Sequence, residues 1–284
     1  MIKITKSFIQ FVFKGFFVFL GKNFSGMFLE ELMKALQKTT KKYTTYHQRP
    51  INTNSVETLS QFSTDLPQLA IVIQGPLKIE NEFTFETIKL YKKHFPKAII
   101  ILSTWNDESN KVLYKIESLG ITILLNDKPD YPGISHINYQ IASSKEGIKK
   151  AKELGAEYAI KTRTDQRMYA TNIASFLFNI IKTFPLNKSI KKQNKRIVGL
   201  SLNTFKYRMY GLSDMFTYGH IDDMLMFWNI PFDNRVFNEK DKEKARLSLR
   251  NFAEMRACEV FLTTEFLKNI GRKQNWTLED SWKV

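Results

Sequence analysis

The chain has 284 residues, of which 43% are hydrophobic and 25% charged, a composition that excludes disordered, collagen-like and coiled-coil proteins. Its single cysteine, Cys258, and four scattered histidines exclude an intramolecular disulfide and a structural zinc site, and they fit a reducing, cytoplasmic compartment. The formal net charge of +15 is local, because residues 1–50 and 186–208 each carry a net +7 and the rest is nearly neutral. We therefore expect no nucleic-acid partner.

The first 36 residues are rich in phenylalanine and lysine. Residues 8–20 are apolar apart from Gln10 and Lys14, and they are too few for a membrane-spanning helix, which needs roughly 20 apolar residues. On a helix, Lys3, Ser7, Gln10 and Lys14 form a narrow polar stripe. This pattern predicts a segment, 1–36, that attaches peripherally to the anionic inner face of the cytoplasmic membrane. A signal peptide or a core helix is the alternative.

Residues 37–68 are rich in Thr, Asn, Ser, Gln and Lys and predict a polar connector. From residue 69 onward, short apolar runs alternate with helical stretches. The runs are 69–73, 98–102, 121–125, 158–168 and 197–202. The helices are expected at 83–95, where Pro96 ends the pattern, before Gly120 and before Gly155. Such runs are typical of parallel strands that are covered on both faces. We predict an α/β domain over 69–284 with an open, mostly parallel sheet flanked by helices.

Polar residues or glycine follow each of the first three runs. Ligands of open α/β sheets bind beyond the carboxyl ends of the strands, so a nucleotide site is expected there. Its predicted residues are Gln74, Gly75, Pro76, Thr104, Trp105, Asn126 and Asp127, with the indole of Trp105 stacking on a base. The glycine patterns of dinucleotide-binding and P-loop proteins are absent after the first run. Ordinary turn chemistry is the alternative for each residue taken singly.

The fourth run, YAIKTRTDQRM (158–168), has a charged residue at every second position. If the strand continues, Lys161, Arg163, Asp165 and Arg167 share one face. Charged side chains on a central strand are costly to bury without partners, so we expect them to face a charged ligand or each other. Lys161 would lie roughly 13 Å from Asp165, and a structural role is expected for it.

Six sequence segments resemble the WavE family of glycosyltransferases. They are IVIQGPL (71–77), IILSTWNDE (100–108), LLNDKP (124–129), NYQIASSKEGI (138–148), YAIKTRTDQRM (158–168) and SDMFTYG (213–219). The similarity covers residues 69 to about 270. The resemblance implies a GT-A-like domain that moves a sugar from a nucleotide-diphospho-sugar donor to lipopolysaccharide core or another bacterial surface glycan.

In GT-A transferases, an acidic motif after a central strand holds a divalent cation on the donor diphosphate. Thr164, Asp165 and Gln166 stand in that place with a single carboxylate. The resemblance therefore implies that Asp165 stabilises the diphosphate, either through Mg²⁺ or Mn²⁺ or together with Arg163 and Arg167, which would neutralise the leaving group directly. An ion pair between Asp165 and one of these arginines is the structural alternative.

Two carboxylates further along the chain are candidates for the base that activates the acceptor. Asp214 lies in the SDMF element, in a strand-like run. Glu259 lies in the apolar stripe of a helix predicted near 252–270, where it is either the base or a buried partner of an arginine such as Arg235 or Arg256. Asp222 and Asp223 begin a further element, and there the helix-dipole interpretation is favoured.

The sequence thus predicts a membrane-associated glycosyltransferase. Its expected partners are a nucleotide-sugar and a lipid-linked or phosphorylated glycan, whose phosphates would meet the basic segment 188–196, unless that segment is simply a solvated loop. The alternative is a non-catalytic nucleotide- or polyanion-binding protein that uses the same strand-end site.

Overall fold

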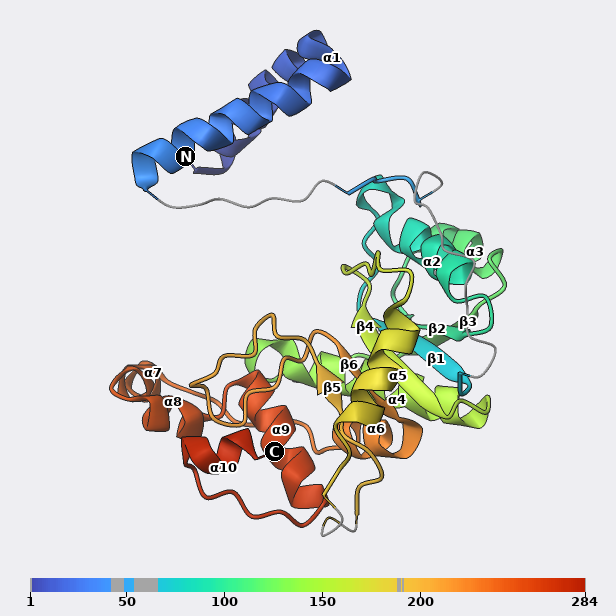
Figure 1. Ribbon diagram of the computed structural model, residues 1–284, viewed down its shortest axis with the longest axis vertical. Coiled ribbons are helices and arrows are strands. Elements are labelled where there is room, and N and C mark those ends of the chain that lie inside the picture. Colours follow the sequence, from blue (N-terminus) through green and yellow to red (C-terminus); the bar gives the residue numbers. More distant parts are fainter. Residues whose placement is uncertain (1, 42–48, 54–65, 188–189, 191, 284) are drawn as a thin grey trace. The chain divides into compact units, whose positions relative to one another are not determined.

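The computed structural model describes residues 2–41, 49–53, 66–187, 190 and 192–283. The chain divides into two compact units, Met1–Arg49 and Pro50–Val284 (Figure 1). Most of the predicted connector, 37–68, lies outside the described residues, and the predicted domain boundaries stay predictions.

The first unit is a helical hairpin. Helix α1 (Ile2–Thr40) is interrupted at Gly21, whose φ of 69° and ψ of 171° are not helical. The rings of Phe16 and Phe17 lie 5.0 and 5.9 Å from that of Phe28. Residues this far apart on a straight helix would be separated by roughly 17 Å, so the chain must reverse at Gly21. A positive φ is accessible to glycine, which explains why the reversal occurs there.

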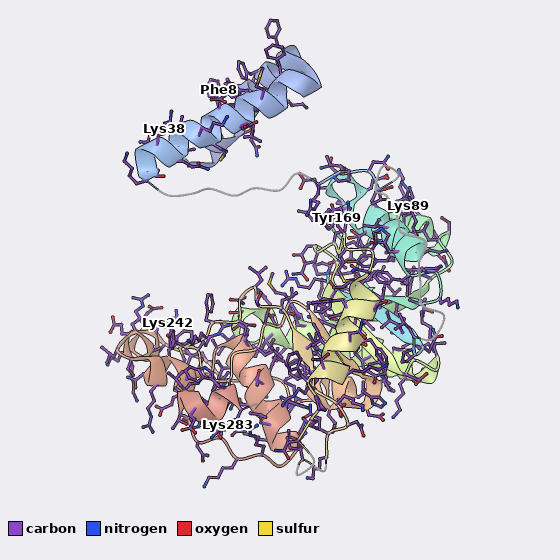
Figure 2. All side chains as sticks on the ribbon, in the orientation of Figure 1. Phe8, Lys38, Lys89, Tyr169, Lys242 and Lys283 are labelled. Carbon is purple, nitrogen blue, oxygen red and sulfur yellow. The ribbon has the colours of Figure 1, made fainter. Side chains whose placement is uncertain are left out.

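Large apolar side chains cover the outside of this hairpin. Phe11 and Phe19 are 77% and 87% exposed, and Phe24 is also exposed. Phe8, labelled in Figure 2, is exposed as well. Within the described part of the chain, no helix has an apolar stretch long enough to cross a bilayer. The single amphipathic helix expected from the sequence is thus replaced by two shorter arms with an exposed apolar surface.

The second unit is built on a sheet of six strands in the order β3-β2-β1-β4-β6-β5. The strands are β1 (Leu69–Gln74), β2 (Ile99–Trp105), β3 (Thr122–Asn126), β4 (Tyr158–Arg163), β5 (Val198–Gly199) and β6 (Thr217–His220). Strands β1 to β4 pair in parallel, whereas β6 is antiparallel to both β4 and β5. This confirms the predicted α/β fold with an open, mostly parallel sheet.

Helices cover both faces of the sheet, because alternate residues of its strands point to opposite sides. On one face, Ile71 and Ile73 of β1 belong to the core shared with α2 (Phe83–His94), α3 (Asn110–Glu117) and α5 (Ile173–Thr183). On the other face, Ala70 and Val72 belong to the core shared with α4 (Ile137–Glu153), α6 (Ile221–Trp228) and α9 (Cys258–Asn269). The remaining helices are α7 (Glu239–Arg246), α8 (Leu249–Met255) and α10 (Leu278–Trp282), with 3-10 turns η2 (Glu80–Glu82) and η3 (Ile134–His136).

Three predicted elements have different bounds in the structure. Strand β2 continues to Trp105 because that residue still pairs with Asn126 of β3. Strand β4 ends at Arg163, five residues before the predicted end at Met168, because the chain turns at Thr164 and Asp165. The run expected at 197–202 contributes only Val198 and Gly199 to the sheet.

The predicted helix 252–270 is two helices, α8 and α9. The break is at Arg256, which has a left-handed φ of 54°. The guanidinium of Arg235 donates to the carbonyl oxygens of Met255 and Arg256, each at 2.7 Å, and so satisfies acceptors at the end of α8. A partner distant in sequence therefore ends the helix.

Candidate functional site

The candidate site lies where the winding of the sheet changes direction. Strands β2 and β3 lie on one side of β1, and β4 lies on the other. The carboxyl ends of β1 and β4 therefore flank the topological switch point, which is where open α/β sheets bind their ligands. The residues that follow there are Gly75 and Pro76 after β1, and Thr164 and Asp165 after β4.

The turn after β1 is held from both neighbouring strands. The hydroxyl of Thr104 donates to the carbonyl oxygen of Gly75 at 2.9 Å, and that of Thr164 donates to Pro76 at 2.6 Å. Gly75 has a φ of +112°, and a Cβ at this position would lie 3.2 Å from Oγ1 of Thr164. Glycine is therefore required here both by the backbone conformation and by the close approach of Thr164.

The turn after β4 presents an ion pair. Nε and Nη2 of Arg163 donate to the two carboxylate oxygens of Asp165, at 2.8 and 2.7 Å. The hydrogen bonds from Arg163 lower the pKa of the Asp165 carboxyl, and the same contact raises the pKa of Arg163. The side chains are 32% and 44% exposed, so the pair faces solvent at the switch point. The structure thus has the ion pair that the sequence left open as the alternative.

The turn after β4 offers one carboxylate, that of Asp165, to the predicted Mg²⁺ or Mn²⁺, and this cation stays a prediction. Both oxygens of Asp165 already accept hydrogen bonds from Arg163. Among the residues that the structure describes, no group of three or more His, Cys, Asp and Glu side chains could hold a metal ion. A guanidinium, rather than a cation-binding carboxylate, is the charged group that this turn offers to an anion.

A buried lysine lies next to the ion pair on β4. The side chain of Lys161 is fully buried, with Nζ 4.4 Å from the ring centroid of Trp228. Nζ donates to Oε1 of Gln140 at 3.1 Å and to the carbonyl oxygen of Asp214 at 2.5 Å. Burial lowers the pKa of Lys161 from 10.5 to about 7, although the negative charge of Asp214 opposes this. The structural role expected for Lys161 agrees with these contacts.

Lys161 fixes the direction of the Gln140 amide. An ammonium group only donates, so the oxygen of Gln140 faces Lys161 and its NH₂ group donates to Oδ2 of Asp214. Gln74, at the end of β1, joins this cluster by donating to Gln140 at 3.4 Å and by accepting from Ser143 at 2.8 Å. Strand β1, helix α4, strand β4 and the loop that contains Asp214 therefore contribute to one polar cluster beside the switch point.

The predicted residues at the ends of β2 and β3 have mainly structural contacts. The amide of Asn126 donates to Oγ of Ser103 and to the carbonyl oxygen of Thr104, at 2.9 and 2.8 Å. Asp127 is exposed and accepts a hydrogen bond from Asn106.

Two predicted ligand contacts do not fit the structure. Trp105 is only 2% exposed and packs edge-on against Tyr139, because it is still part of β2. Its indole is therefore not placed to stack on a base. Arg167 donates to Thr87 at 2.8 Å, to Phe83 at 2.9 Å and to Ile51 at 3.1 Å. Its guanidinium ties residues 50–51 to α2 instead of facing a diphosphate, since β4 ends before it.

Glu259 is buried at the start of α9 and is paired with an arginine. It accepts a hydrogen bond from Asn203, and its Oε1 lies 3.4 Å from Nη1 of Arg208. The arginines expected as partners have others: Arg235 pairs with Asp233, and Arg256 with Glu265. Glu259 therefore anchors the segment that contains Asn203 and Arg208.

Asp214 lies within electrostatic reach of Arg163 and of Cys258, the neighbour of Glu259. Burial, the neighbouring Glu259 carboxylate and then the charge of Asp214 raise the pKa of the Cys258 thiol. Asp214 also contributes to the raised pKa of Arg163, after Asp165. The structure thus brings Arg163, Asp165 and Asp214 to one region, and which carboxylate acts as a base stays a prediction.

Asp222 and Asp223 lie in the first turn of α6, as the helix-dipole interpretation predicted. Asp223 is fully buried and accepts from the backbone N–H groups of Asn194 and Lys195, each at 2.8 Å. Asp223 therefore fixes the backbone of Asn194 and Lys195, which belong to the predicted basic segment 188–196. Lys188, Ser189 and Lys191 lie outside the described residues.

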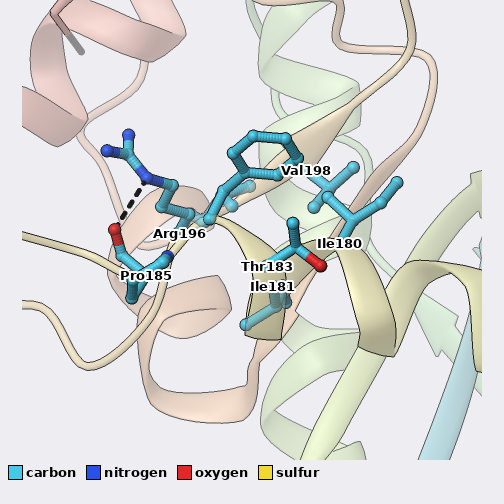
Figure 3. A pocket seen from close by; sticks show the side chains of 8 residues that line it. Ile180, Ile181, Thr183, Pro185, Arg196 and Val198 are labelled. Carbon is cyan, nitrogen blue, oxygen red and sulfur yellow. Dashed lines mark hydrogen bonds between the residues drawn. The ribbon is translucent and has the colours of Figure 1, made fainter.

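A shallow apolar groove lies away from this region. It is lined by the end of α5 and the residues around Val198, and Nε of Arg196 donates to Pro185 at 3.3 Å on its rim (Figure 3). Because β5 runs parallel to β4, the start of β5 is at the edge of the sheet opposite to Arg163. The groove is therefore not part of the candidate site.

Comparison with known proteins identifies the family. A model of the WavE family, described as WavE lipopolysaccharide synthesis, matches residues 69–276. The chain belongs to the WavE family. The WavE match begins at the first residue of β1 and includes all six strands and every candidate site residue. It confirms the resemblance and places the chain in lipopolysaccharide synthesis. A search of curated proteins finds no match.

Gln140 was not predicted as a site residue, although it lies in one of the WavE-like segments, NYQIASSKEGI. A glutamine on a helix carries no signal of its own. Gln140 and the buried Ser143 and Ser144, at spacings of three and four, are nevertheless unusually polar for a helix face that covers the sheet.

Proposed function

We propose that this WavE protein is a glycosyltransferase that uses a nucleotide-diphospho-sugar donor and a lipopolysaccharide-core or related surface-glycan acceptor. The observation that carries the proposal is the solvent-facing Arg163–Asp165 pair at the switch point of the sheet. A cationic group there suits a diphosphate. Membership of a family of lipopolysaccharide synthesis supports a sugar donor as the molecule that carries this diphosphate.

Arg163 acts on the leaving group. Transfer breaks the bond between the sugar C1 and the diphosphate oxygen, and negative charge develops on the departing nucleotide. A guanidinium held in place beforehand stabilises this charge without reorganising during the reaction. Asp165 provides that orientation, since it binds Nε and Nη2 of Arg163 at once. The Arg163 guanidinium, anchored by Asp165, supports a reaction that needs no divalent cation.

Asp214 is the preferred base. As the new bond forms between C1 and the acceptor hydroxyl oxygen, the hydroxyl proton passes to a carboxylate oxygen of Asp214. The amide of Gln140, oriented by Lys161, holds Oδ2 of this carboxylate. Glu259 is the weaker candidate because Arg208, Asn203 and Cys258 all contact its oxygens.

The test is turnover of sugar nucleotides with deacylated lipopolysaccharide core as the acceptor. We expect Asp165→Asn to lower kcat/KM on the order of 100-fold, because the guanidinium loses its anchor at the developing charge. Asp222→Asn is a matched control, since Asp222 is also 44% exposed and also pairs at 2.7 Å, with Lys152. It lies at the opposite edge of the sheet, at the start of α6, and should retain full activity.

Three results would contradict the proposal. Equal turnover by Asp165→Asn and Asp222→Asn would remove the assigned role of the ion pair. Loss of activity in EDTA, restored by Mg²⁺ or Mn²⁺, would show that a cation acts on the diphosphate. Tight binding of a sugar nucleotide without any turnover would favour the non-catalytic nucleotide-binding protein.

A further inference from the structure

The segment between β5 and β6 begins and ends at the same edge of the sheet as the candidate site. Gly199, the last residue of β5, pairs with Thr217, the first residue of β6, and Thr217 pairs with Lys161 of β4. Residues 200–216 therefore extend beyond the carboxyl end of β4. Asp214, the proposed base, belongs to this segment, so the segment lies on the acceptor side of the proposed reaction.

The outer part of this segment is held from two sides. From α9, Glu259 binds Asn203 and Arg208. From the C-terminal helix α10, the indole nitrogen of Trp282 donates to the carbonyl oxygen of Lys206 at 2.8 Å, and Oγ of Ser281 accepts from the backbone of Tyr210 at 2.7 Å. These contacts fix the backbone around residue 206 relative to α9 and α10.

Between these anchors the segment and α10 expose aromatic rings around a cation. Tyr207 and Trp282 are 54% and 56% exposed, and Nζ of Lys206 lies 5.4 and 5.6 Å from their ring centroids. Leu202 and Phe205 in the same segment are exposed as well. Burying these rings inside the fold would stabilise the folded chain. Their exposure therefore indicates a binding surface.

The chemistry of this cluster fits one kind of ligand. Aromatic rings offer flat apolar faces to the C–H groups of a sugar, and their amphipathic character tolerates the surrounding hydroxyls. The ammonium of Lys206 adds a contact for an anionic substituent. We propose that Lys206, Tyr207 and Trp282 form the binding surface for the acceptor, a saccharide that carries a phosphate or carboxylate. This inference rests on the proposed glycosyltransferase function, and Glu259 serves it as a positioning residue.

Binding can be measured without any donor. The probe is deacylated, phosphorylated lipopolysaccharide core oligosaccharide, titrated into the full chain by calorimetry. We expect Tyr207→Ala to weaken binding about 5- to 10-fold through loss of one ring contact. Lys206→Met should weaken binding of the phosphorylated probe, while enzymatic removal of the phosphates should make wild type and Lys206→Met equal. Tyr114→Ala, at a tyrosine of α3 that is 71% exposed, is the matched control.

The kinetic assay separates this inference from the proposed function. If transfer occurs, Tyr207→Ala should raise KM for the acceptor and leave KM for the donor unchanged. Equal oligosaccharide binding by Tyr207→Ala and Tyr114→Ala would overturn the acceptor surface even if the protein is a transferase. A selective loss of vesicle binding, with unchanged oligosaccharide binding, would also overturn it and assign the cluster to a lipid surface. Absence of turnover with intact oligosaccharide binding would instead contradict the transferase.

Discussion

A buried lysine controls the polar cluster around Asp214, and its ionisation should be visible in stability. Lys161 has a pKa of about 7 in the folded chain, against an ordinary value of 10.5. Between these values the unfolded chain holds a proton that the folded chain has released, so the free energy of unfolding rises with pH. We expect wild type to gain stability relative to Lys161→Met as the pH increases from 7 to 10, by at most about 1.4 kcal/mol per pH unit.

Urea unfolding of both proteins between pH 6 and pH 10 measures this difference. The comparison with Lys161→Met cancels the titration of all other groups. Below pH 7 the two curves should run parallel, because Lys161 is then protonated in both states. Parallel curves across the whole range would show that the folded chain keeps the proton on Lys161 throughout.

Single residues show where sequence reasoning succeeds and where it stops. The alternation of charges in KTRTDQR correctly indicated a cluster at the end of β4, because Lys161 and Arg163 do share a face. The same argument could not predict the role of Arg167, since this role depends on the strand ending at Arg163. Trp105 was assigned to a loop because STW looks polar, whereas pairing with β3 keeps it in the sheet.

At the scale of elements, the turn after β1 can be tested by adding a side chain at Gly75. Gly75→Ala adds a Cβ 3.2 Å from Oγ1 of Thr164, whose hydroxyl holds Pro76. We expect a loss of stability on the order of 1–3 kcal/mol from the positive φ and the displaced hydroxyl together. We also expect reduced transferase activity, because the residue after Thr164 is Asp165. Thermal unfolding and turnover measure the two effects.

Gly155→Ala is the matched control for this substitution. Gly155 also has a positive φ, +86°, but a Cβ there would meet nothing within 4 Å. It should show the cost of the backbone conformation without the crowding, and it should keep its activity. Equal losses of stability and activity in the two variants would mean that the contact with Thr164 has no effect on the site.

The elements that were predicted well are those with strong local patterns. Apolar runs located β1 and β3 within a residue or two, and Pro96 correctly limited α2. The break between α8 and α9 was not predictable, because it depends on Arg235, which lies 20 residues from the Met255 carbonyl it binds. The reversal of α1 at Gly21 was missed because a glycine that directly follows an apolar run does not by itself separate a hairpin from a straight helix.

At the scale of the whole molecule, the strand order decides where function is expected. Parallel pairing of β1 to β4 followed from the alternation of runs and helices, but the position of β4 on the other side of β1 did not. That position creates the switch point beside Gly75 and Arg163. The antiparallel β6 begins at this edge with Asp214 just before it, so Lys161 and Asp214, which are 53 positions apart in the chain, lie in contact.

The first unit precedes the region matched by the WavE family and exposes several phenylalanines. We propose that the hairpin attaches the protein to anionic membranes, because exposed phenylalanines accompany Lys14 and Lys38, and each lysine near an anionic surface contributes about 1 kcal/mol. Phe11→Ser/Phe19→Ser in the full chain should abolish most sedimentation with vesicles that contain phosphatidylglycerol. Because both rings point outward, the hairpin contacts of Phe28 are preserved.

The control for this variant is Phe176→Ser, a phenylalanine of α5 that is 55% exposed. It should sediment like wild type, and vesicles of phosphatidylcholine alone should bind wild type more weakly than anionic ones, since they lack the charge that attracts the lysines. Undiminished sedimentation of Phe11→Ser/Phe19→Ser would show that the hairpin is not the membrane contact. Catalytic turnover with a soluble acceptor should be unaffected by these changes, because the site is confined to residues of the second unit.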